Sequence, residues 1–146
     1  MQPTKNQIAL AELKFSYQAL KKHLTVTNAK ASSQFLQQLW QQTLPNSETD
    51  FYVLFVKHNY EVFSWYRLPK KEKADVYAAQ IAGLAVSSCA YGVIISQCCN
   101  VKQIKASSYD VLFATVCFGK CEQVNIEIID YIICSKSSYF SLKENN

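Results

Sequence analysis

The sequence has little glycine and little proline, three of each among 146 residues. Collagen-like and other low-complexity chains contain far more of both, so these classes are excluded. About half of the chain is hydrophobic (49%), 13% is aromatic and only 18% is charged, which excludes a disordered chain. A chain of this length buries a substantial core and is too short for two comfortable domains.

A strong charge of one sign is also missing. Fifteen basic residues oppose eleven acidic ones, which leaves a net charge of +4 that is spread along the chain. Phosphate-contacting domains usually show a stronger and more clustered basic signature, so nucleic-acid binding is not supported. Residues 70–73 (KKEK) form a short mixed-charge run typical of a solvated loop. Trp40, Trp65 and Tyr66 lack an accompanying basic cluster, and we expect them in the core or an interface.

The N-terminus lacks the apolar run of a signal peptide, since residues 1–6 read MQPTKN. The six cysteines are therefore interpreted as reduced thiols of a cytoplasmic protein, and adjacent Cys98 and Cys99 cannot pair without strain. Residues 76–101 carry no charge but include Gln, Ser and Gly and lack the dense Leu, Ile and Phe of a lipid-exposed helix. We expect a buried helix and a buried strand there, and no membrane contact.

Hydropathy patterning predicts the element order β, α, ββ, α, β, α, ββ, which gives a mixed sheet with helices packed against it. The predicted strands cover residues 12–17, 51–56, 62–66, 92–96, 124–134 and 139–142. A basic connector follows the first strand and contains Lys21, Lys22, His23 and Lys30. A polar loop is predicted over residues 97–106. Residues 1–11 are predicted to be a flexible N-terminus and residues 12–146 a single domain.

Three helices are predicted from caps and apolar stripes. The first is capped by Ser32 or Ser33 and has the stripe Phe35, Leu36, Leu39 and Trp40. The second, residues 76–89, is capped by Asp75. The third begins at Ser107, ends at Gly119 and has the stripe Val111, Leu112, Thr115 and Phe118.

Several segments resemble, in this order, the RadC-like branch of the JAB/MPN metalloprotease-fold domains. Residues 12–17 (ELKFSY) are similar to its opening strand, residues 51–63 to its EeFkvlLLN hairpin, and residues 76–95 to its Ala-rich helix and strand. Residues 129–133 (IDYII) stand where the family has lDHlIi, and residues 139–144 (YFSLKE) where it has YySFkE. The resemblance implies one α/β (α+β) domain of JAB/MPN type, a three-layer, cytidine deaminase-like fold with a mixed sheet flanked by helices.

Active members of this fold carry a zinc motif: a Glu, then His-x-His-Pro, seven residues and Ser-x-x-Asp. The resemblance implies that the two His and the Asp bind zinc, the Glu is the general base and the Ser stabilises the oxyanion. Ser107 and Asp110 stand at the Ser and Asp of the motif, but Gln97 and Cys99 stand at the two His. Thr49 stands at the Glu. Ser-x-x-Asp at a helix start is also the pattern of a capping box, so both retained residues have a structural explanation.

The remaining donors are weak. A glutamine amide is rarely a zinc ligand, and the Cys99 thiolate and Asp110 carboxylate supply two of the four ligands of a tetrahedral site. Of the two histidines, His23 lies in the predicted connector and His58 at the predicted hairpin tip. Glu48 directly precedes the general-base position and would point to the opposite face of a strand, unless a bulge redirects it.

The cysteines offer a second metal hypothesis. A metal site would form if four thiols converged in the fold, although their spacing matches no familiar zinc knuckle: Cys98, Cys99, Cys117 and Cys121. A nucleophilic Cys98 or Cys99 would need a nearby base such as His, and none lies in this segment.

We therefore expect a catalytically inactive, pseudo-metalloprotease domain that acts in the cytoplasm as a protein-binding or scaffold module. No catalytic residue or cofactor is predicted, and Cys99 and Asp110 are weak metal candidates at the motif. The partner is an unidentified protein, with a homodimer as one option. Two alternatives stay open: a zinc-dependent hydrolase (isopeptidase or protease) with a rebuilt site, and a DNA-associated protein, in line with the family's DNA-repair label.

Overall fold

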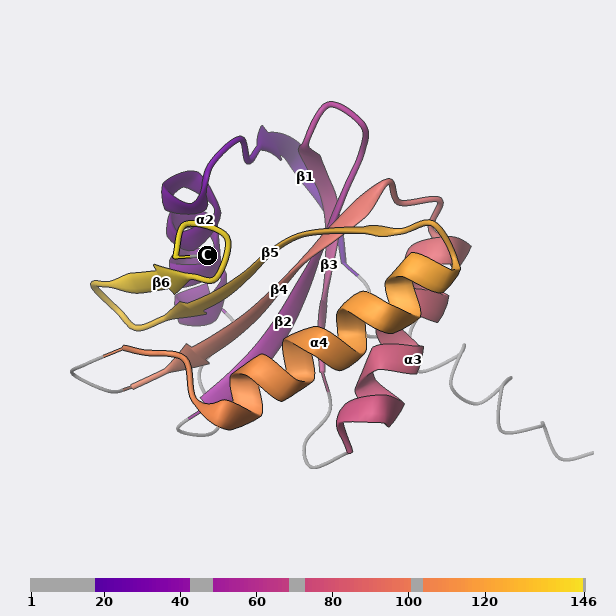
Figure 1. Ribbon diagram of the computed structural model, residues 1–146. Coiled ribbons are helices and arrows are strands. Elements are labelled where there is room, and N and C mark those ends of the chain that lie inside the picture. Colours follow the sequence, from indigo (N-terminus) through magenta and orange to yellow (C-terminus); the bar gives the residue numbers. More distant parts are fainter. Residues whose placement is uncertain (1–17, 43–48, 69–72, 101–103, 146) are drawn as a thin grey trace, which may run out of the picture.

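The computed structural model describes residues 18–42, 49–68, 73–100 and 104–145. Within them, six strands form one sheet with the order β1-β3-β2-β4-β5-β6 (Figure 1). The β4–β5 pair is parallel and the other pairs are antiparallel. The elements follow the predicted order: β1 (Gln18–Thr25), α2 (Ala29–Gln42), β2 (Thr49–Val56), β3 (Glu61–Arg67), α3 (Ala74–Ser87), β4 (Gly92–Cys99), α4 (Ser108–Gln123), β5 (Glu127–Cys134) and β6 (Tyr139–Ser141).

The sheet is the middle of three layers, with α2 on one face and α3 and α4 on the other (Figure 1). Side chains along β2 alternate between two cores. Val53 and Phe55 pack with α3 and α4, whereas Tyr52 and Leu54 pack with α2. β2 lies between β3 and β4 and is buried on both faces, as its continuous apolar run predicts. The predicted single α/β domain with a mixed sheet flanked by helices is thus confirmed.

The first described strand differs from the prediction. Lys21, Lys22 and His23, predicted in a connector, belong to β1, which pairs with β3 and contains an irregularity between Ala19 and Leu24. β1 is an edge strand, where basic residues are common, so its charge resembled that of a loop. The predictions for residues 1–17, for Glu48 and for most of the loop 70–73 lie outside the described residues.

Two predicted helix caps are wrong. Asn28 is the cap of α2, because its Oδ1 accepts a hydrogen bond from the backbone N–H three residues on at 2.8 Å. Ser32 and Ser33 lie inside the helix, and their hydroxyls donate to backbone carbonyls of the preceding turn. Asp75 lies in the first turn of α3, where its negative charge interacts favourably with the helix dipole. The cap position is Lys73, whose side chain forms no capping hydrogen bond.

The apolar stripe predicted for α2 is confirmed. Leu36, Leu39 and Trp40 are buried in the α2 core. Trp65 packs against the same core and Tyr66 is buried in the other, so the interpretation of the aromatic residues as core is also confirmed.

The stripe predicted for α4 is wrong. Four predicted core positions face solvent: Val111, Leu112, Thr115 and Phe118. The buried side instead carries Asp110, Phe113, Cys117 and Cys121, and the helix continues past Gly119 to Gln123. Apolar residues occur on both sides of this helix, so their periodicity alone did not identify the core side. None of the described helices combines the length and apolarity needed to cross a membrane.

β4 is longer than predicted. Gln97, Cys98 and Cys99 were assigned to a loop, but they continue the strand. Gln97 and Cys98 pair with both β2 and β5, and Cys99 pairs with β2. These pairings satisfy the backbone, and sulfur side chains bury readily. Consequently two of the predicted site residues lie on a central strand rather than on a loop.

Candidate functional site

The positions singled out by the motif lie at one end of the sheet, around the ends of β2 and β4 and the start of α4. Thr49, whose backbone alone is described, is directly opposite Cys99 in the β2–β4 ladder. Gln97 is two residues before Cys99, so the strand alternation places both on the same face. Ser107 is the N-cap of α4, and Asp110 lies in the first turn of that helix.

Both carboxylate oxygens of Asp110 already accept hydrogen bonds. Oδ2 accepts from the Ser107 backbone N–H at 2.9 Å and from its hydroxyl at 2.7 Å. The Asp110 N–H in turn donates to Ser107 Oγ at 3.1 Å, which completes the capping box. Oδ1 accepts from the Tyr131 hydroxyl at 2.9 Å. The structural explanation of Ser-x-x-Asp is therefore confirmed.

Tyr131 is the residue that sequence reasoning missed. It lies on β5, is 2% exposed and stands at the histidine of the family's lDHlIi motif. Burial, and then the neighbouring Asp110 carboxylate, raise the pKa of Tyr131, so it stays a neutral donor. A tyrosine within a buried apolar strand needs a hydrogen-bond partner, and this was the available signal. The sequence of β5 alone does not show that Asp110 is this partner.

Cys99 and Gln97 are poorly suited to bind a metal. Cys99 is 7% exposed, and burial, the nearby Cys134 and Asp110 together raise the pKa of its thiol. The thiolate, the form that metals and nucleophilic reactions require, is thus disfavoured. Gln97 Oε1 is buried and has no hydrogen-bond partner in the structure, but it is a neutral amide oxygen.

This donor set does not fit zinc. It consists of a neutral amide, a thiol whose pKa is raised and a carboxylate that accepts three hydrogen bonds, whereas zinc takes three or four imidazole, thiolate or carboxylate ligands. In the parts of the chain that are described, no group of three or more His, Cys, Asp or Glu side chains is arranged to hold a metal ion.

The two histidines lie away from this site. His58 is in the turn between β2 and β3, at the opposite end of β2 from Thr49, and its ring packs on Tyr91 with centroids 4.3 Å apart. His23 is in β1, and β3 and β2 separate that strand from β4. The expectation that neither supplies the missing ligand is consistent with these positions.

The four thiols do not converge. Cys98 faces the α2 core, where its Sγ lies 3.1 Å from that of Cys134. Cys99, Cys117 and Cys121 belong to the opposite core. Burial raises the pKa of Cys117 to about 12 and that of Cys121 to about 11, so both are protonated core residues at neutral pH. The hypothesis of a four-thiol metal site is not supported.

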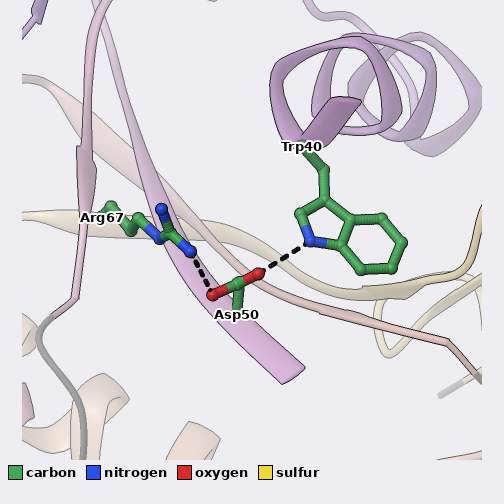
Figure 2. Close-up of polar contacts among 3 residues, drawn as sticks. All are labelled: Trp40, Asp50 and Arg67. Carbon is green, nitrogen blue, oxygen red and sulfur yellow. Dashed lines mark hydrogen bonds and ion pairs between the residues drawn. The ribbon is translucent and has the colours of Figure 1, made fainter. Parts of the chain in front are cut away.

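A second buried carboxylate lies next to the general-base position but on the other face. Asp50 is 5% exposed and accepts from Trp40 Nε1 of α2 at 2.8 Å and from the Arg67 guanidinium of β3 at 2.5 Å (Figure 2). This network joins α2 to the sheet. Because β2 side chains alternate, Asp50 cannot reach the face that carries Cys99. Its signal in the sequence was an acid directly before a buried apolar run.

Comparison with known families places these features in a context. The family model of the RadC-like JAB domain matches residues 26–146. The match contains every element from α2 to β6 and all five motif positions. No curated protein matches the chain.

Proposed function

The chain belongs to the RadC-like JAB domain family, and we propose that it is a catalytically inactive member that acts as a protein-binding or scaffold module. One observation carries this proposal: Ser107 and Tyr131 donate hydrogen bonds to both oxygens of the Asp110 carboxylate. The carboxylate that would face a metal is thereby built into a helix cap and a contact between α4 and β5.

Energetics support the same conclusion. Hydrogen bonds to a charged group contribute about 1.5–3 kcal/mol each, and Asp110 accepts three of them. A metal would have to share this carboxylate with three hydrogen-bond donors. It would gain only an amide oxygen and a thiol that must first lose its proton.

The general base is also unsupported. The family's position for it holds Thr49, which has no carboxylate. The adjacent Asp50 is buried on the α2 face and bound by Trp40 and Arg67. At the general-base position itself, the described residues therefore offer no carboxylate that faces the Cys99 side.

A binding role is supported by the outer side of α4. Val111, Leu112 and Phe118 are 51%, 56% and 54% exposed. Large apolar side chains that are exposed and grouped on one surface are typical of interaction surfaces. All six cysteines are free thiols, which supports the cytoplasm as the proposed location.

Zinc content tests the proposal. The purified chain, the Cys99→Ala variant and the matched core variant Cys121→Ala are incubated with zinc, dialysed and analysed by plasma mass spectrometry. We expect far less than one zinc per chain in all three. A stoichiometric zinc that survives dialysis, is lost in Cys99→Ala and is kept in Cys121→Ala would contradict the proposal. It would instead support the zinc hydrolase with a rebuilt site.

A further inference from the structure

In the described part of the chain, nothing covers the apolar outer side of α4. Val111, Thr115 and Phe118 recur at the i, i+4, i+7 spacing and therefore share one side of the helix, with Leu112 beside them. All four are exposed. In Figure 1 α4 runs across the front of the sheet, and no described element packs over its outer side.

Exposed charges of opposite sign flank this surface. Lys105 lies just before the start of α4, and Glu122 lies in its last turn. Neither forms an ion pair with any described residue. The two charges are separated by the length of the 16-residue helix, so they cannot neutralise each other within one chain.

We propose that α4 pairs in an antiparallel manner with α4 of a second copy of this chain. A two-fold axis perpendicular to the helices brings Val111 opposite Phe118 of the second copy. It also brings Glu122 next to the α4 N-terminus and Lys105 of that copy. The negative charge of Glu122 is favoured there both by the positive end of the helix dipole and by the Lys105 ammonium. A parallel pair would place Lys105 beside Lys105 and Glu122 beside Glu122. Charge complementarity therefore selects the antiparallel dimer.

Gly119 supports close contact on this side. A Cβ built at Gly119 would meet nothing within 4 Å, so the fold of the single chain does not require glycine there. Glycine inside a helix costs about 1 kcal/mol relative to alanine. A residue without a side chain allows the backbone of a second helix to approach closely.

This inference rests on the proposed binding function and names the partner. Sedimentation velocity of the full chain over a concentration series tests it. We expect a dimer whose dissociation constant rises at least tenfold in Phe118→Asp. Val86→Asp on α3, where Val86 is 49% exposed, is the matched control and should leave the dimer unchanged. A wild-type chain that stays monomeric, or a dimer that Phe118→Asp does not weaken, would overturn the inference.

A charge exchange tests the antiparallel arrangement. Lys105→Glu and Glu122→Lys should each raise the dissociation constant about threefold to tenfold, because each puts like charges together. The double variant should return it close to the wild-type value. Additive weakening in the double variant would overturn the arrangement. The zinc measurement is independent of these results, so failure of the dimer and failure of the proposed inactive site can be told apart.

Discussion

Tyr131 and Asp110 show how a single contact changes the chemistry of the site. The Tyr131 hydroxyl donates to Asp110 at 2.9 Å from the position where the family motif has histidine. Asp110 is 4% exposed, so its buried oxygens need hydrogen-bond donors around them. The hydrogen bond stabilises the carboxylate and links α4 to β5.

Tyr131→Phe should lower the free energy of unfolding by about 2 kcal/mol at pH 7, because it leaves a buried charged oxygen without its donor. Urea unfolding measures the loss. Tyr139→Phe on β6 is the control, since Tyr139 is only partly buried, and we expect a change within about 0.5 kcal/mol there. Equal losses in the two variants would contradict the assigned role.

The same residue predicts a pH dependence. Burial and then Asp110 raise the pKa of Tyr131 above its ordinary value of 10.0. A group whose pKa is raised on folding stabilises the protein fully below the unfolded pKa, and this contribution is lost as the pH rises above it. The difference in unfolding free energy between wild type and Tyr131→Phe should therefore shrink above about pH 10. A difference that grows with pH would contradict the assignment.

At the residue level, the sequence predicted one of the three helix caps correctly. The spacing of Ser107 and Asp110 correctly predicted the capping box, because both partners lie three residues apart. The Asp110–Tyr131 bond joins residues 21 positions apart and depends on how α4 lies on β5. The ion pair of Asp50 with Arg67 likewise depends on the register of β2 and β3.

At the element level, the errors concern ends and faces. β4 was predicted to end at residue 96 but extends to Cys99, because partners on β5 continue to Cys98 and partners on β2 continue to Cys99. α4 was assigned the wrong buried side, because both of its sides are apolar and only the packing on the sheet distinguishes them. Local patterns identify the type of an element, and tertiary partners decide its length and orientation.

Replacing two glycines with alanine should change the free energy of unfolding in opposite directions, which tests how tightly the elements pack around them. A Cβ on Gly92 would lie 2.7 Å from the Glu127 backbone oxygen, at the start of the parallel β4–β5 pair. Gly92→Ala should therefore lower the unfolding free energy by about 1–3 kcal/mol. Gly83→Ala on α3, where a Cβ meets nothing within 4 Å, should raise it by up to about 1 kcal/mol. Urea unfolding checks both, and shifts of the same sign would be inconsistent with this packing.

At the level of the whole molecule, element order was the strongest prediction. Alternating apolar runs and turn residues specified the order of elements and the mixed sheet between helices. The family match then covered residues 26–146. The motif positions could be located in the sequence because their spacing follows the chain. How Asp110 is engaged required the three-dimensional arrangement of α4 and β5.

We propose that Gln97, Cys99 and Asp110 do not form a zinc site. Anomalous diffraction at the zinc absorption edge, from crystals soaked in zinc, tests it most directly. We predict no anomalous peak within about 2.5 Å of the donor atoms of these three residues. A peak coordinated by all three side chains would contradict the account.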